Sequence, residues 1–209
     1  MYYPIVLKVK DRRVVVIGGG EVAEAKVQTL LESGADVKVI SPEATSWLRE
    51  LAEAGKIMWI ARTYDSSDLE NAFFVVAATD DPAVQDRIWR DARQRNVLIN
   101  SVDDPDRCDF IMPSVLRRDD LIVAVSTSGK SPAFAAWLQR QLAGIVTKEF
   151  GRAVSLLGSM RSEFQQRFKN LEERKRAYQR IFATNIVKWI ADCDDETAKS
   201  RVHELIENL

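Results

Sequence analysis

The segment between residues 14 and 43 constrains the fold of this chain more than any other. A branched apolar run at Val14–Ile17 leads into three consecutive glycines, and an amphipathic stretch then continues to Gly34. A second apolar run follows at residues 37–40. This order predicts a strand, a tight turn, a helix and a second parallel strand. The segment therefore predicts an α/β fold of the Rossmann type, with a doubly wound parallel sheet.

The glycine turn has the pattern of a dinucleotide-binding loop. It reads Gly18-x-Gly20-x-x-Ala23, with alanine in the third position. Gly18 permits the tight turn, Gly20 lets the backbone approach a pyrophosphate, and Ala23 lets the helix pack closely on the strand. The helix N-terminus offers N–H groups and a partial positive charge to phosphates. We expect a dinucleotide here; a tight turn without a ligand is the alternative.

The bulk composition excludes several classes of protein. With 46% hydrophobic residues, 29% charged residues and a net charge of -1, the chain has no bias toward nucleic acid or a membrane. No apolar run approaches ~18 residues, and the N-terminus lacks the layout of a signal peptide. Cys108 and Cys193 are isolated thiols that suit the cytoplasm. The single histidine, His203, supports neither a Ser-His-Asp triad nor a zinc site, so we expect no bound metal.

The first 110 residues alternate between strand and helix, as in a parallel sheet. Strands are expected at residues 13–17, 37–40, 57–61, 73–78 and 97–101, and helices at 22–32, 44–54 and 83–95. The pattern then changes to a β-hairpin, with strands at 110–117 and 121–126 joined by a polar turn. A helix is expected at 133–150, and further helices at 174–191 and 195–209.

Ligands of an open α/β sheet bind beyond the carboxyl ends of its strands, where four segments of this chain converge. These are Gly18–Val22, Ser41–Glu43, Thr79–Asp81 and Asn100–Asp104. The end of the second strand usually carries an acid for the ribose hydroxyls, but Ser41-Pro42 occupies this position, with Glu43 beyond it. No arginine is placed there to receive a 2′-phosphate. Glu43 is either a ribose contact or a helix-start acid.

Two carboxylates, Asp103 and Asp104, follow the fifth strand. A carboxylate beside a nicotinamide can accept a proton while a hydride leaves the substrate. The alternative is turn chemistry, because aspartates are common in loops. A second loop, Ser128-Gly129-Lys130-Ser131-Pro132, precedes a helix, with Ser131 as its expected N-cap. It departs from the P-loop pattern and suits a carboxylate-bearing ligand; a simple capped turn is the alternative.

The helical tail is rich in basic side chains, interrupted by Glu172 and Glu173. A solvated helix face is the simpler interpretation, and a ledge for a polyanionic substrate is the alternative. The basic residues are Arg161, Arg167, Lys169, Arg174, Lys175, Arg176 and Arg180.

Several blocks together resemble the precorrin-2 dehydrogenases, a family that also forms the N-terminal part of siroheme synthase. The resemblance covers about residues 4–145, and the Phe-Ile-Met-Pro-Ser block is specific to the family rather than to nucleotide binders in general. The blocks are Gly18-Gly19-Gly20-Glu21-Val22-Ala23, Ala77-Ala78-Thr79-Asp80-Asp81, Asn100-Ser101-Val102-Asp103, Phe110-Ile111-Met112-Pro113-Ser114 and Val123-Ala124-Val125-Ser126-Thr127-Ser128-Gly129.

The resemblance implies NAD-dependent oxidation of precorrin-2 to sirohydrochlorin by a homodimer, with Asp103 as the catalytic residue. It carries cofactor positions over to Glu21, Val22, Pro42 and Glu43. Together with the glycine turn and the strand ends, the expected cofactor site is Gly18, Gly20, Glu21, Val22, Ser41, Pro42, Glu43, Thr79 and Asp80. It places the substrate at Asn100, Ser128, Gly129, Lys130 and Ser131. The implied domains are an NAD-binding domain at 1–112, a dimerisation region at 113–150 and a helical domain at 151–209.

Some members of the family also insert ferrous iron, so a ferrochelatase activity is left open. Because His203 and the two cysteines lie outside the family blocks, we expect this activity to be weak or absent. The alternative from another class is a regulatory module that senses NAD without turnover. A short-chain reductase would need Tyr-x-x-x-Lys, whereas Tyr64 and Tyr178 are followed four residues later by Asp68 and Phe182.

Overall fold

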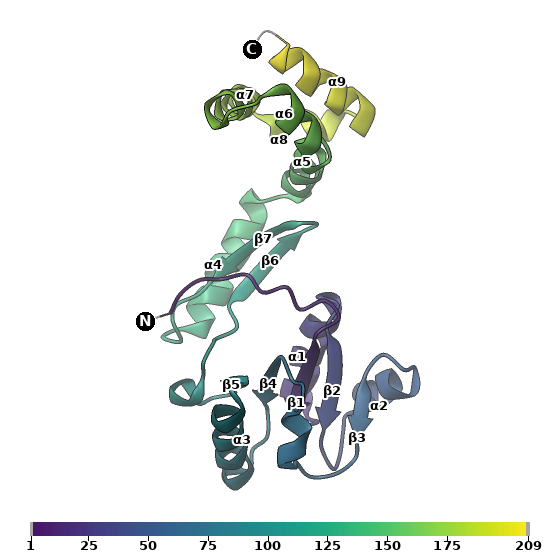
Figure 1. The fold of residues 1–209 in the computed structure, drawn as a ribbon, viewed down its shortest axis with the longest axis vertical. Coiled ribbons are helices and arrows are strands. Elements are labelled where there is room, and N and C mark those ends of the chain that lie inside the picture. The colour runs from purple at the N-terminus through teal and green to yellow at the C-terminus, as the bar shows by residue number, and fades with distance from the viewer. Residues whose placement is uncertain (1, 208–209) are drawn as a thin grey trace. The chain divides into compact units, whose positions relative to one another are not determined.

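The computed structural model describes residues 2–207 and divides the chain into two compact units. The first unit, Met1–Met112, holds a five-stranded sheet and its helices. The second unit, Pro113–Leu209, holds a two-stranded hairpin and the remaining helices (Figure 1). The expected α/β fold of the Rossmann type, followed by a hairpin and a helical region, is confirmed.

The sheet is parallel throughout, with the strand order β3-β2-β1-β4-β5. Val14 in the first strand lies level with Val37 on one side and Phe74 on the other. The chain runs outward from β1 in both directions, so the strand order reverses between β1 and β4, and ligands of such sheets bind at this point. The strands are β1 (Arg13–Ile17), β2 (Asp36–Ile40), β3 (Met58–Ile60), β4 (Phe74–Ala77) and β5 (Leu98–Ser101).

Alternate side chains of the strands enter two separate cores, which explains why nearly every strand residue is apolar. Val14 and Val16 pack with helices α1 (Glu21–Glu32) and α2 (Ser46–Glu53). Val15 and Ile17 pack on the opposite face with α3 (Pro82–Arg95).

Side-chain caps set where two of these helices begin. The α2 helix begins later than expected because Thr45 precedes it as the N-cap and accepts a hydrogen bond from the Leu48 N–H at 3.3 Å. Asp81 caps α3 in the same way, accepting from the N–H groups of Ala83 and Val84.

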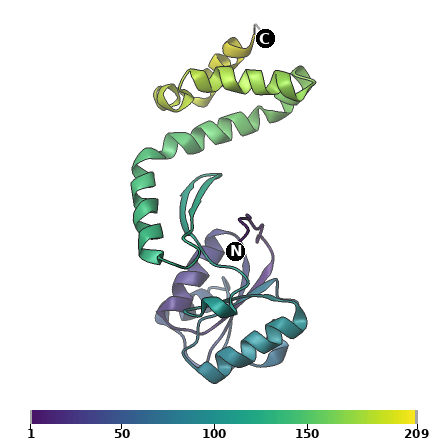
Figure 2. The same cartoon turned by 90° about the vertical axis from the view of Figure 1, so that its left-hand side faces the viewer.

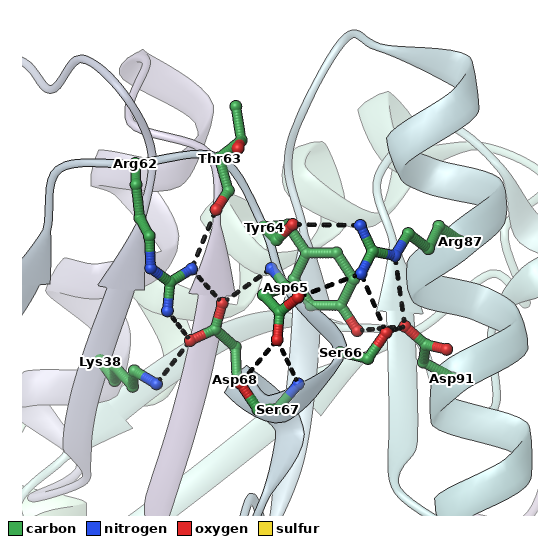
Figure 3. Close-up of polar contacts among 10 residues, drawn as sticks. All are labelled: Lys38, Arg62, Thr63, Tyr64, Asp65, Ser66, Ser67, Asp68, Arg87 and Asp91. Atoms are coloured by element: carbon green, nitrogen blue, oxygen red, sulfur yellow. Dashed lines mark hydrogen bonds and ion pairs between the residues drawn. The ribbon is translucent and has the colours of Figure 1, made fainter.

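A short 3-10 helix, η1 (Ser66–Leu69), stands in the connection from β3 to β4, where such folds usually have a long helix. It buries the Asp68 carboxylate, whose side chain is 0% exposed. Lys38 from β2 donates to this carboxylate at 2.8 Å, and Arg62 donates to both of its oxygens at 2.7 and 2.8 Å (Figure 3). No local sequence pattern predicts this network, because Lys38, Arg62 and Asp68 come from separate segments.

A second set of polar contacts joins the same connection to α3. The hydroxyls of Tyr64 and Ser66 donate to Asp91 at 2.8 and 2.7 Å. Arg87 reaches back from α3 to Asp65 at 3.3 Å, as Figure 3 shows. Polar contacts therefore hold the connection both to the sheet, through Asp68 and Lys38, and to α3, through Asp91 and Arg87.

The second unit begins with β6 (Ser114–Arg118) and β7 (Leu121–Val125), which pair antiparallel as predicted. Helix α4 (Pro132–Ile145) packs along this hairpin (Figure 2). The first hairpin strand starts at Ser114 rather than at the expected residue 110. Phe110 instead packs edge-on against Phe74 of the first unit, with ring centroids 5.0 Å apart.

The expected continuous helix at 133–150 is wrong. Helix α4 ends at Ile145, and α5 (Lys148–Ser159) begins after Val146 and Thr147. Arg118 of the hairpin donates to the carbonyl oxygens of Ala143 and Val146, at 3.3 and 3.0 Å, and so satisfies the end of α4. The branched side chains of Val146 and Thr147 also favour a break.

The remaining helices enclose a core of their own around Phe164, Ile181, Ile190 and Val202. The expected helix at 174–191 is interrupted at Asn185, whose φ of 53° is left-handed. The expected final helix at 195–209 is described as far as Ile206, and residues 208 and 209 lie outside the described part. The helices are α6 (Arg161–Arg167), α7 (Leu171–Ala183), α8 (Ile186–Trp189) and α9 (Asp195–Ile206). No helix within residues 2–207 has the length and apolarity needed to cross a membrane.

Replacing Asp68 with asparagine should destabilise the first unit. Burial raises the pKa of Asp68, but the hydrogen bonds from Arg62 and Lys38 outweigh it and lower the pKa from 3.8 to about 2. Breaking a buried ion pair costs roughly 3–5 kcal/mol, and we expect about 3 kcal/mol because Arg62 reaches solvent. Urea unfolding of wild type and Asp68→Asn at neutral pH measures this.

The loss should also depend on pH, because the folded pKa is lower than the unfolded one. The stabilisation is complete above the ordinary pKa of 3.8 and is lost as the pH falls toward about 2. The gap in unfolding free energy between wild type and Asp68→Asn should therefore narrow below about pH 4. A gap that stays constant on acidification would show that the Asp68 charge does not stabilise the fold.

Candidate active site

A crevice of about 390 Å³ opens at the carboxyl ends of β4 and β5, beside the start of α1. It lies at the reversal of strand order, where ligands of this type of sheet bind. Four of the predicted site residues line it together: Val22, Thr79, Asp80 and Asp103. The other lining residues are Ala78, Pro82, Gln85, Val102, Asp104 and Arg107.

Two glycines allow close packing of the turn after β1. Gly18 has a φ of 124°, and a side chain there would overlap the carbonyl oxygen of Ala78, which follows β4. A side chain at Gly19 would overlap the carbonyl oxygen of Glu43, which follows β2. The Gly18 N–H donates to Ile40 and the Thr45 N–H donates to Gly19, both at 2.9 Å. The turn after β1 is therefore packed against the ends of both neighbouring strands.

Gly20 differs from the two glycines before it. It is the N-cap of α1, no side chain caps the helix there, and a side-chain carbon at this position would meet nothing within 4 Å. A ligand can thus approach the backbone and the first N–H groups of α1 without obstruction. This arrangement fits the pyrophosphate of a dinucleotide. Glu21 and Val22, both exposed, form the first turn of the helix.

The residues after β2 fall into two kinds. Ser41 is only 5% exposed, and both its hydroxyl and its carbonyl oxygen accept from the Trp59 indole N–H, at 3.3 and 3.2 Å. Its hydroxyl is therefore committed to the fold. Pro42 and Glu43, the next two residues, are exposed.

The two neighbouring carboxylates after β5 have different surroundings. Asp104 pairs with Arg107 at 3.2 Å, and Arg107 also reaches Asp86 at 3.4 Å. Asp103 is exposed to the crevice and has no ion-pair partner among residues 2–207. Its left-handed backbone, with a φ of 62°, turns the chain at this point. Of the two carboxylates, Asp103 is the one available to a ligand.

Buried polar groups hold the loop that carries Asp103. The Asn100 amide donates to the carbonyl oxygen of Phe110 at 3.0 Å, and the side chain is only 7% exposed. The Cys108 sulfur accepts from the Ser101 N–H at 3.2 Å and lies 3.3 Å from the carbonyl oxygen of Asp104. Burial raises the pKa of the Cys108 thiol. Asn100 and Cys108 thus pack behind the loop.

Gln85 and Arg107 line the crevice but were missed in the sequence. Gln85 joins two walls of the crevice, since its amide donates to the carbonyl oxygen of Thr79 at 2.8 Å and its oxygen accepts from the Ser101 hydroxyl at 2.5 Å. Their spacing in the sequence could have indicated them. Gln85 lies one helical turn after the Asp81 cap, and Arg107 lies three residues after Asp104.

The predicted substrate loop, Ser128 to Ser131, belongs to the second unit. Ser128 and Gly129 both have left-handed backbones, and the Ser131 hydroxyl accepts from the Phe134 N–H at 3.3 Å as the cap of α4. Three N–H groups of the loop, those of Ser128, Lys130 and Ser131, already donate to Ser126 or Thr127 just before it. The exposed Lys130 side chain is the main group left for an anion. Among the described side chains, no cluster of His, Cys, Asp and Glu is arranged to hold a metal ion.

Two family models match the chain. Residues 5–114 match a family described as putative NAD(P)-binding, which covers the first unit. Residues 118–144 match the central region of sirohaem biosynthesis proteins, which covers the hairpin turn, β7 and most of α4.

Curated relatives match the chain over most of its length. Siroheme synthase 1 of Serratia proteamaculans is 34% identical over 208 residues, which is 100% of this chain and 44% of that protein. Siroheme synthase 3 of Aeromonas hydrophila is 38% identical over 88% of this chain and 39% of that protein. This chain thus spans less than half the length of the curated relatives it matches.

Among solved structures, SirC, a precorrin-2 dehydrogenase, is similar over 100% of both chains, with a TM-score of 0.74 and 22% sequence identity. This likeness supports the fold. The family resemblance inferred from the sequence blocks is confirmed by these comparisons. Because the first model matches more than half of this chain, the chain belongs to the putative NAD(P)-binding family; residues 118–144 are also similar to the central region of the sirohaem biosynthesis proteins.

Proposed function

We propose that this chain catalyses the NAD-dependent dehydrogenation of precorrin-2 to sirohydrochlorin. The observation that carries the proposal is the crevice, which is lined by Asp103, a carboxylate without an ion-pair partner among residues 2–207, and by Val22 at the start of α1, two residues after the open Gly20. The similarity to siroheme synthases supports precorrin-2 as the substrate, and the fold shared with a precorrin-2 dehydrogenase is consistent with it.

The start of α1 binds the pyrophosphate of the cofactor in this proposal, because its N–H groups and dipole favour an anion. Val22, Thr79 and Asp80, which line the crevice, would hold the nicotinamide half. Pro42 and Glu43 would contact the adenosine ribose, and the buried Ser41 would support them. A carboxylate at Glu43 disfavours the 2′-phosphate of NADP, so NAD is the preferred cofactor.

The reaction removes a hydride and a proton from precorrin-2. When bound, the nicotinamide accepts the hydride. Asp103 accepts the proton as a general base and releases it to water, which completes the balance. Asp104 stays paired with Arg107 and does not take part. Asn100 and Gln85 act by holding the loop and the crevice wall in place.

Precorrin-2 is a polycarboxylate, so its binding requires cations and N–H donors. We propose that Ser128, Gly129, Lys130 and Ser131 bind its carboxylates, with Lys130 supplying the charge. Asp103 is also the base available for iron insertion into the product. We still expect this activity to be weak, because carboxylates alone guide ferrous iron poorly.

We further propose that residues 113–150 form the interface of a homodimer. The hairpin and α4 expose several large apolar side chains, a pattern that marks association surfaces. On α4, Phe134 and Trp137 are 52% and 47% exposed, and their ring centroids lie 5.3 Å apart. Val115, Ile122 and Ile145 extend the exposed apolar surface.

Anaerobic incubation with precorrin-2 and NAD should give sirohydrochlorin, followed by its absorption spectrum, with a lower rate when NADP replaces NAD. The rate with NADP should be lower because no cation stands at the Ser41 position to bind its 2′-phosphate. Binding of NAD without turnover would instead identify a sensor module. Equal or better turnover with NADP would disprove the cofactor preference alone.

Gly20→Ala should fold normally but bind NAD at least about tenfold more weakly. The added methyl group enters open space, and Gly20 has an extended backbone that alanine also adopts, so only the approach of the pyrophosphate is obstructed. Calorimetric titration with NAD measures the loss. Gly144→Ala, whose methyl group also meets nothing within 4 Å, is the control. Gly18→Ala, by contrast, should lower the free energy of unfolding of the first unit by at least about 3 kcal/mol.

Asp103→Asn should lower kcat by about 10²–10⁴ and leave the affinity for NAD unchanged. Asparagine keeps the shape and tolerates the left-handed backbone, so only the proton acceptor is lost. Asp104→Asn is the matched control and should stay within about threefold of wild type, since a general base contributes far more than this. If Asp104→Asn caused the large loss instead, the base would be assigned to the wrong carboxylate.

A further inference from the structure

A groove of about 720 Å³ lies in the second unit, between the α5–α6 corner and α7. It belongs entirely to the helical region, and no residue of the crevice lines it. Leu171 and Phe182 stand in its wall with 60% and 56% of their surface exposed. An apolar groove with large exposed side chains is a candidate binding site.

Aromatic rings form one wall of the groove. Phe164 is 1% exposed and stacks on Tyr178, with centroids 5.0 Å apart and planes at 23°. Tyr178 in turn stacks on Phe182, at 6.0 Å and 21°. The three rings form a nearly parallel series that ends in the exposed Phe182. Such a wall suits a flat conjugated ligand, which can extend the series.

The charged residues of the groove are all cationic. Arg161, Arg174 and Lys175 line it, and no lining residue is acidic. Lys175 is already paired with Glu172 at 2.9 Å. Arg161 and Arg174 have no carboxylate partner among residues 2–207, and the Arg174 Nε is shielded from solvent without a hydrogen-bond acceptor. Two unpaired guanidinium groups therefore face an apolar groove, where carboxylates of a ligand would be strongly favoured.

We propose that this groove is a second binding site for a flat, conjugated polycarboxylate of the tetrapyrrole class, distinct from the crevice. The aromatic wall contacts the face of the macrocycle, and Arg161 and Arg174 bind its peripheral carboxylates. The choice of a tetrapyrrole rests on the proposed function, whereas the class of flat polyanion rests on the groove alone. The groove would hold substrate or product on the protein, outside the crevice, without taking part in the reaction.

The basic residues of the tail separate into groups that a test can use. Arg167 donates to the carbonyl oxygens of Ile206 and Glu207 at the end of α9, at 2.9 and 3.2 Å, and so supports the fold. Arg176 and Arg180 lie on α7, like Arg174, but outside the groove. They provide controls with the same charge on the same helix.

The test is binding of uroporphyrin, a flat tetrapyrrole polycarboxylate, to the full chain saturated with NAD, followed by its absorption and fluorescence. Arg161→Gln/Arg174→Gln should weaken binding at least about tenfold, as expected for the loss of charge-assisted hydrogen bonds. Phe182→Ala should weaken it through the lost stacking. Arg176→Gln/Arg180→Gln should leave it within about twofold at the same ionic strength, since exposed charges outside a site contribute little.

Equal weakening by both double variants would show a non-specific charge effect and overturn the proposal. Binding unaffected by the groove variants would place uroporphyrin outside the groove and also overturn the proposal. A change in oligomeric state with Arg161→Gln/Arg174→Gln, measured by sedimentation, would make the groove an interface between copies and overturn it as well. None of these outcomes affects the crevice, whose test is dehydrogenation by the Asp103 and Gly20 variants.

Discussion

The turn after β1 depends on having no side chain at two successive positions, and the architecture of the first unit is organised around this constraint. Gly18 lies against the carbonyl oxygen of Ala78 and Gly19 against that of Glu43. The ends of β1, β2 and β4 can meet closely only because both positions are glycine. The third glycine has no such neighbour, and its open surroundings make the same turn able to bind a ligand.

A buried charge supports the other side of the same sheet. The connection from β3 to β4 has only a 3-10 helix, so it covers the sheet with Asp68 held between Lys38 and Arg62. A buried carboxylate is tolerated only when its hydrogen bonds are satisfied, as they are here. The stabilisation that the Asp68 carboxylate provides depends on pH. The stabilisation from the apolar packing of α1 and α2 on the opposite face does not.

Charge pairing also distinguishes groups that look equivalent in the sequence. Arg107 engages Asp104, which leaves Asp103 as the free carboxylate of the crevice. In the helical region, Arg167 is used to close α9, while Arg174 has no partner among the described residues. In both regions the group without an internal partner is the one available to a ligand, because a paired group must first lose its partner.

The sequence alone determined the parallel sheet, the dinucleotide turn and the hairpin, because each depends on local periodicity and on glycine positions. It also indicated Asp103 through the resemblance of its block. Only the tertiary structure decided that α4 ends at Ile145, since Arg118, which caps it, lies 27 residues earlier. It likewise decided that Asp68 is buried. These features depend on contacts between distant segments, which local patterns do not encode.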